Sequence, residues 1–197
     1  MAGLSIHKFC AAFLLVIGVV CTNADGTEKP EIDMEIWVSR NQLLDSMTED
    51  WENLTEYALA WSKEVCQKVL DEDILQNETS VDPETREISL NNCVGSTVDR
   101  FDPTESHRGD HPDEVPLRKY GFEEFRKVMD QKYEHFFEEM VQRMDDYVKG
   151  LTPEQQDKET ARNLKGWSGK IKNAPTLAMK EMAFRKCMRF YYFERGV

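Results

Sequence analysis

The clearest pattern in the chain is an apolar stripe between residues 122 and 148. Its members recur at steps of three and four residues: Phe122, Phe125, Met129, Tyr133, Phe136, Met140, Met144 and Val148. This spacing places them on one side of an α-helix of roughly thirty residues, which buries that side. Gly150 is a typical residue for the end of such a helix.

A second helical pattern covers residues 33 to 73. Its later half carries apolar residues at the same steps: Leu54, Tyr57, Ala58, Trp61, Val65 and Val69. Trp37, Leu43 and Leu44 come earlier and predict a preceding helix. The polar residues from Asp45 to Thr48 indicate a break between the two.

Two more helices are predicted in the last third of the chain. Thr152, Pro153 and Gln155 provide an N-cap, a proline at the first helical position and a capping-box glutamine. The helix that they begin is expected to reach about Lys172, and its apolar residues are Leu164, Trp167 and Ile171. Pro175 opens the last helix, whose apolar residues are Leu177, Met182, Phe184, Cys187, Met188 and Tyr191.

Residues 74–118 lack this regularity. Asn, Asp, Thr, Ser, Gly and Pro accumulate there, and four prolines interrupt any continuous helix: Pro83, Pro103, Pro112 and Pro116. Glu87 to Leu90 indicates at most a short strand. We therefore predict an all-α fold, a small bundle of four to five helices with a long irregular loop at about 74–118.

The first 24 residues have the features of a cleavable signal peptide. Lys8 precedes an apolar run from Phe9 to Val20, and the small residue Ala24 follows. The run is shorter than the about 20 residues that span a bilayer. We expect cleavage after Ala24, with Cys21 as the alternative. The prediction is a signal peptide at 1–24 and a single secreted, extracellular domain at 25–197, with no transmembrane segment.

Charge is unevenly divided after this signal. Residues 25–197 carry 24 basic and 37 acidic residues, a net charge of −13. This acidity disfavours binding of nucleic acid or of anionic membrane over the whole surface. Residues 161–197, however, contain nine basic residues and two acids. Either the basic end packs on the acidic body, or it forms a face for an anionic partner such as a sulfated glycan or phospholipid headgroups.

Cysteines and glycosylation motifs follow from the expected export. Cys66, Cys93 and Cys187 remain after cleavage, and secretion favours disulfides. The short separation favours Cys66 with Cys93. Cys187 would then be buried in its helix or would link two chains in a dimer. Asn53 and Asn77 each begin an Asn-x-Thr acceptor, and Asn77 is favoured because a loop follows it.

The irregular segment carries two further candidates. Arg108-Gly109-Asp110 is the tripeptide that integrins recognise, and it lies in a polar stretch between prolines. His107 and His111 flank it among several carboxylates. Their spacing matches no metal-binding pattern, so we predict no metal site.

The sequence contains no catalytic signature. The nucleophile elbow, the paired-histidine zinc motif and the phosphate-binding glycine loop are all missing. His135 lies among carboxylates in a helical pattern, which is typical of a surface residue. We therefore expect no enzymatic activity and no cofactor.

The leading hypothesis is a secreted, N-glycosylated, acidic helical protein that binds an extracellular partner, either an unknown protein or an anionic glycan. An acidic protein of the extracellular matrix or of mineral is the first alternative. The second is a carrier of an apolar small molecule. Its cavity would be lined by Phe136, Met140, Met144, Met182 and Phe184.

Overall fold

The computed structural model describes residues 34–77, 82–104, 111–112 and 114–193. The expected signal peptide and Arg108-Gly109-Asp110 lie outside these residues. Within them the chain is all-α, as predicted, with five longer helices and two short ones. The helices are α1 (Met34–Asn77), α2 (Pro83–Asp99), α3 (Glu114–Arg118), α4 (Phe122–Gly150), α5 (Pro153–Gln156), α6 (Glu159–Lys172) and α7 (Leu177–Phe193).

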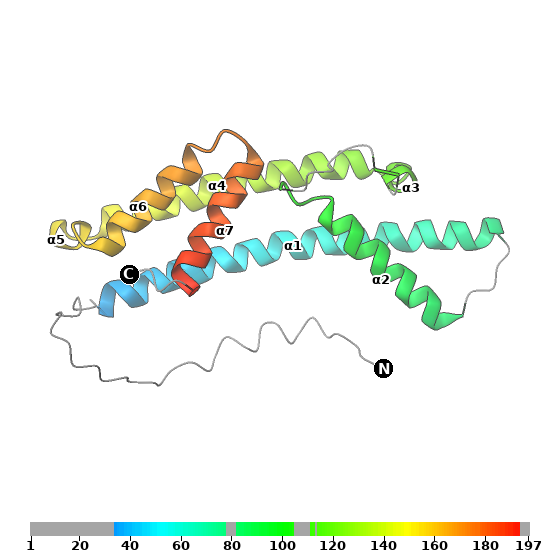
Figure 1. Ribbon diagram of the computed structural model, residues 1–197, viewed down its shortest axis with the longest axis horizontal. Coiled ribbons are helices and arrows are strands. Elements are labelled where there is room, and N and C mark those ends of the chain that lie inside the picture. Colours follow the sequence, from blue (N-terminus) through cyan, green and yellow to red (C-terminus); the bar gives the residue numbers. More distant parts are fainter. Residues whose placement is uncertain (1–33, 78–81, 105–110, 113, 194–197) are drawn as a thin grey trace. The chain divides into compact units, whose positions relative to one another are not determined.

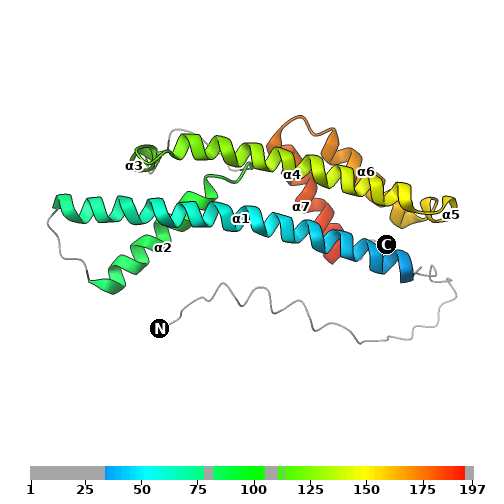
Figure 2. The same cartoon turned by 180° about the vertical axis from the view of Figure 1, so that it is seen from behind.

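The helices α1 and α4 run antiparallel along each other and form the centre of the bundle (Figures 1 and 2). The C-terminal half of α1 packs against α2. The C-terminal half of α4 packs against α6, and α7 lies on both α4 and α6. In the described residues, none of the helices is both long enough and apolar enough to cross a membrane.

The predicted break near Asp45 is wrong, because α1 continues through it for 44 residues. Leu44 and Met47 are buried and keep the apolar side in register across the polar residues. The Ser46 and Thr48 hydroxyls donate hydrogen bonds to the carbonyls of Leu43 and Leu44, at 2.7 and 3.0 Å. These side chains therefore bond within the helix instead of ending it.

The prediction for α4 is confirmed. Seven of the eight residues in its apolar stripe are buried and Val148 is half-buried. The stripe contacts α1 through two groups of aromatic rings. One group surrounds Trp51 and the other surrounds Trp61.

Part of the stretch predicted as an irregular loop is helical. The helix α2 covers Glu87 to Leu90, so the suggested strand there is wrong. Asp82 caps α2 by accepting a hydrogen bond from the Thr85 amide at 2.9 Å, and Pro83 takes the first helical position. Asp82-Pro83 is therefore a helix start of the same kind as Thr152-Pro153.

The predicted helix after Gly150 is divided in two. The capping box of Thr152 and Gln155 is present, but it caps only the four residues of α5. A break at Asp157 and Lys158 then separates α5 from α6. No residue of α5 is buried, so no packing holds it in line with α6.

Candidate functional site: the basic face of α6 and α7

The two C-terminal helices bury one side each and leave the other in solvent. In α6 the buried side includes Ala161, Leu164 and Ile171. In α7 it includes Phe184, Cys187 and Tyr191. This region contains eight basic residues, and all of them except the half-buried Lys180 are exposed: Arg162, Lys165, Lys170, Lys172, Lys180, Arg185, Lys186 and Arg189.

Only one acidic residue accompanies these eight basic residues between positions 161 and 193. This residue is Glu181, and its side chain is completely buried. All formal charges that α7 and residues 161–172 of α6 expose are therefore positive. By contrast, α1 contains ten acidic and three basic residues.

Aromatic side chains join the outer sides of α6 and α7 into one face. The Lys170 ammonium lies 3.8 Å from the Trp167 ring centroid, in cation–π geometry. The Trp167 ring in turn packs on Phe190 of α7, with centroids 5.8 Å apart. Lys186 and Arg189 are exposed on the turns of α7 around Phe190. We call Trp167, Lys170, Lys186, Arg189 and Phe190 the basic face.

Some of the basic charge of α7 instead packs on the acidic body. Lys180 pairs with Glu134 of α4, and Arg185 donates a hydrogen bond to Asp102, which follows α2, at 2.6 Å. The interpretation that the basic end packs on the acidic body therefore describes one side of α7. One side joins the helix to the bundle and the outer side carries the basic face.

Glu181 lies beside this junction, on the buried side of α7. Its carboxylate accepts a hydrogen bond from Arg185 Nε at 2.9 Å, and its second oxygen has no hydrogen-bond partner in the described structure. The pKa of Glu181 is raised to about 7, mainly by burial and in part by the nearby carboxylate of Asp102, against the lowering effect of Arg185. Burial also acts to raise the pKa of Asp102, but hydrogen bonds from Thr104 and the charge of Arg185 outweigh it and lower that pKa.

Sequence reasoning overlooked the burial of Glu181. A signal for it exists, because residue 181 lies in the apolar phase of α7, four residues after Leu177 and three before Phe184. The same helix contains an apolar residue that the sequence wrongly assigns to the buried side. Met182 was predicted on the apolar side, but it is 44% exposed, because it points away from that phase.

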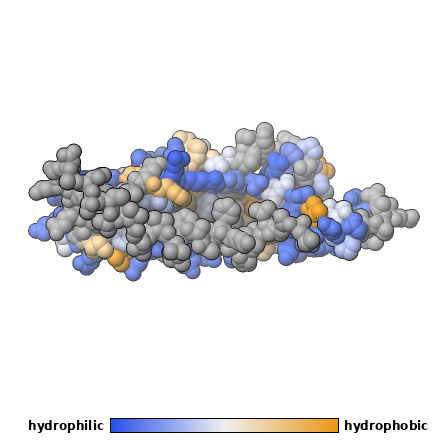
Figure 3. All heavy atoms as spheres, turned by 60° about the horizontal axis from the view of Figure 1, so that its bottom comes forward, coloured by the Kyte–Doolittle hydropathy of each residue, from blue (hydrophilic) through white to orange (hydrophobic). Residues whose placement is uncertain are grey.

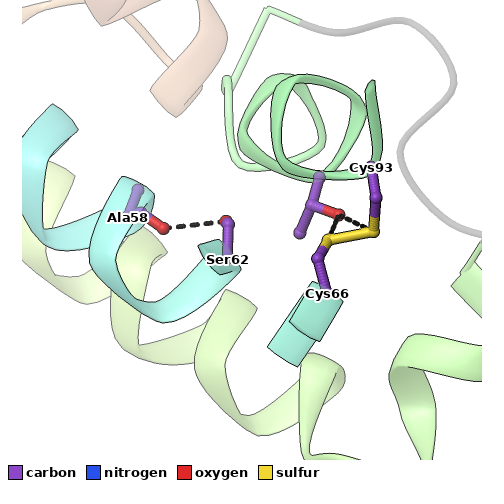
Figure 4. Close-up of a disulfide and its surroundings, with 5 residues drawn as sticks. Ala58, Ser62, Cys66 and Cys93 are labelled. Carbon is purple, nitrogen blue, oxygen red and sulfur yellow. Dashed lines mark hydrogen bonds between the residues drawn. A yellow bond between two sulfur atoms is a disulfide. The ribbon is translucent and has the colours of Figure 1, made fainter. Parts of the chain in front are cut away.

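The structure joins Cys66 of α1 to Cys93 of α2 in a disulfide, the pairing that the sequence favoured (Figure 4). The Thr97 hydroxyl lies 3.4 Å from the Cys66 sulfur. Cys187 is free and completely buried, and burial raises the pKa of its thiol to about 12. A thiol without an exposed surface cannot link two such chains, so we do not propose a dimer bridged by Cys187.

The remaining sequence candidates lie apart from the basic face. Asn53 is exposed on α1, as glycosylation requires. Asn77 is the last residue of α1, and its side chain lies outside the described part. His135 is an exposed residue 3.4 Å from Glu139. No group of three or more potential metal ligands occurs among the residues that the structure describes.

The core residues predicted for a carrier pack against other rings. Phe136 and Phe184 lie 5.6 and 5.3 Å from the Trp51 ring and 5.3 Å from each other, so the three rings pack directly together. On the uncovered part of the face in Figure 3, hydrophilic residues dominate and apolar residues form small, separate patches. Neither observation favours a carrier cavity in this part of the core.

Comparison with protein-family models, with curated proteins and with solved structures gives no match to this chain. The geometry and charge of its own residues therefore carry the functional argument.

Proposed function

We propose that this chain is a secreted, N-glycosylated helical protein that binds an anionic extracellular glycan through the basic face and has no chemistry of its own. Export is supported by the signal-like residues 1–24, and the Cys66–Cys93 pair fits an oxidising compartment. Asn53, which is exposed, and Asn77 are the proposed glycan acceptors.

The observation that carries the proposal is the absence of exposed acid between positions 161 and 193 among the residues described. In an acidic protein, random exposure would mix both signs on any surface. Here eight basic residues share the region with one buried carboxylate. The surface is therefore locally cationic despite the negative total charge.

Screening explains how such a face can act within an acidic molecule. At physiological salt the Debye length is about 8 Å, so charges farther away contribute little at the surface. A bound sulfate then responds mainly to Lys170, Lys186 and Arg189. Arginine and lysine form charge-assisted hydrogen bonds with such oxyanions, and these bonds weaken as salt rises.

Heparin affinity tests the proposal. The purified protein is expected to bind heparin at low salt and to elute as salt increases. A Lys170→Glu, Lys186→Glu, Arg189→Glu variant should lose binding. The matched control is Lys63→Glu, Lys127→Glu, Lys149→Glu, whose substitutions lie on α1 and α4. It changes the total charge of the protein by the same amount as the first variant. The control should bind heparin more tightly than the first variant.

Two results would contradict the proposal. One is a control variant that loses heparin binding as completely as the basic-face variant, because total charge would then explain it. The other is binding to phosphatidylserine vesicles that is stronger than binding to heparin, since the partner would then be a membrane surface.

A further inference from the structure

A cavity of about 370 Å³ lies between the C-terminal half of α1, one side of α2 and the short α3. Val69 and Leu70 of α1 form an apolar wall together with Pro116 and Leu117 of α3. Small-molecule sites commonly measure about 300–1,000 Å³, with mostly apolar walls and a few polar groups. The cavity is therefore large enough for a small ligand.

The wall that α2 contributes carries a row of polar side chains. Asn92, Ser96 and Arg100 follow each other at four-residue steps and so lie on one ridge. None of these three side chains has an ion pair or hydrogen bond within the described part of the chain. The row therefore presents unused donors opposite an apolar wall.

Arg100 is the charged member of this row, and it is half-buried. The other charged residue at the cavity is Glu114, whose side chain is completely buried. Its carboxylate lies 3.5 Å from the Arg118 guanidinium and 3.6 Å from that of Arg126, which offset its charge. Among the described residues that line the cavity, no carboxylate therefore forms an ion pair with Arg100.

The Cys66–Cys93 disulfide fixes the two longer walls relative to each other. Cys93 itself lines the cavity, and its partner lies on α1 one turn before Val69 and Leu70. A site held in this way loses little conformational freedom when a ligand enters.

We propose that this cavity binds a small amphipathic carboxylate, whose apolar chain lies against Val69, Leu70 and Leu117. Its carboxylate accepts hydrogen bonds from the Arg100 guanidinium, and Ser96 and Asn92 provide further donors. The site is separate from the basic face and stands without the glycan proposal.

Calorimetric titration with octanoate tests the site, with 1-octanol and octyltrimethylammonium as probes of the same chain length. Octanoate should bind at least tenfold more tightly than either of the other two. It is the only one of the three with a negatively charged group that can pair with the Arg100 guanidinium. The amide chemical shifts that it perturbs should lie on α2 and at the end of α1. Failure of octanoate to bind at millimolar concentration, or shifts confined to α6 and α7, would overturn the proposal.

Variants on α2 sharpen this test. Arg100→Met should reduce octanoate affinity at least tenfold and leave octanol affinity unchanged. Arg86→Met removes an arginine of the same helix that pairs with Asp71 outside the cavity, and should change neither. Ser96→Phe should fill the cavity and abolish binding of both probes. Equal losses in Arg100→Met and Arg86→Met, with unchanged circular dichroism, would refute the assignment.

Discussion

Two tryptophans on α1, ten residues apart, are surrounded by aromatic rings that come from different parts of the chain. Trp51 lies 5.4 Å from Tyr133 of α4 and 5.3 Å from Phe184 of α7. Trp61 lies 4.3 Å from Phe125 of α4 and 5.6 Å from Phe101, which follows α2. Each tryptophan therefore joins α1 and α4 to a third element.

The two third elements are secured differently. A disulfide ties α2 to α1 beside Trp61. Beside Trp51, α7 is held without a covalent bond, and its side toward Asp102 depends on Arg185 and the buried Glu181. The packing around Trp61 thus depends on the oxidation of Cys66 and Cys93, and the packing around Trp51 depends on the protonation of Glu181. Asp102 directly follows Phe101, so the charged group also connects the two regions.

Removing the ring that the third element contributes to each region should have the largest effect. Phe184→Ala and Phe101→Ala each delete a buried phenyl ring, and each should lower the free energy of unfolding by about 3–5 kcal/mol. Urea denaturation at pH 7 measures both. A cost under about 1 kcal/mol for Phe101→Ala would show that the Trp61 region does not need its third element.

Removing the disulfide should separate the two regions. The bond closes a separation of 27 residues, for which chain entropy gives about 3.5 kcal/mol. In a Cys66→Ala, Cys93→Ala variant, amide exchange should accelerate most in α2, while α6 and α7 retain more protection. Equal acceleration in all helices would contradict independent anchoring.

The Trp51 region should respond to pH through Glu181. Its pKa is about 7 in the folded chain, above the ordinary value of 4.5, so the folded state binds the proton more tightly. The resulting destabilisation is absent below about pH 4.5, grows up to about pH 7 and is constant above it. Glu181→Gln should therefore stabilise the protein at pH 8, by up to about 3 kcal/mol, and have little effect at pH 4.5.

Thermal unfolding of the wild-type protein and Glu181→Gln between pH 4.5 and pH 8 measures this difference. Lys186→Gln is the control, because Lys186 is exposed on the same helix. A stability gap between Glu181→Gln and wild type that does not change with pH would remove the protonation argument.

The sequence predicts the helices well where one apolar period is unbroken. The stripe of α4 gives the boundaries of that helix almost to the residue. The error at Asp45 to Thr48 has a local cause, since short polar residues favour helix ends but can also bond within a helix. The apolar phase from Leu44 to Trp51 was the better guide. Asp82-Pro83 is a helix start signal, although a proline in an irregular stretch by itself predicts only an interruption.

The sites were less accessible to sequence reasoning. The excess of basic residues after position 160 predicts a basic surface, but it does not say which residues pack on the acidic body. Lys180 and Lys186 look alike in sequence, yet one pairs with Glu134 and the other is exposed. The cavity beside Arg100 depends on α1, α2 and α3 meeting, and no periodicity within one helix contains that information.

Exposed ion pairs should contribute least in both regions. Arg143 of α4 lies 2.5 Å from Asp50, beside Trp51, and Arg86 of α2 pairs with Asp71 near the disulfide. These side chains are 36–48% exposed, so water and salt screen their attraction. Arg143→Met and Arg86→Met should each change the free energy of unfolding by less than about 1 kcal/mol. In 0.5 M salt the difference between each variant and wild type should be smaller still, because the Debye length falls to about 4 Å. If Arg143→Met alone lowered the free energy of unfolding by more than this, and salt did not reduce the loss, the Trp51 region would depend on its surface charges as well as on its rings. Electrostatic attraction would then contribute more to the Trp51 region than to the Trp61 region.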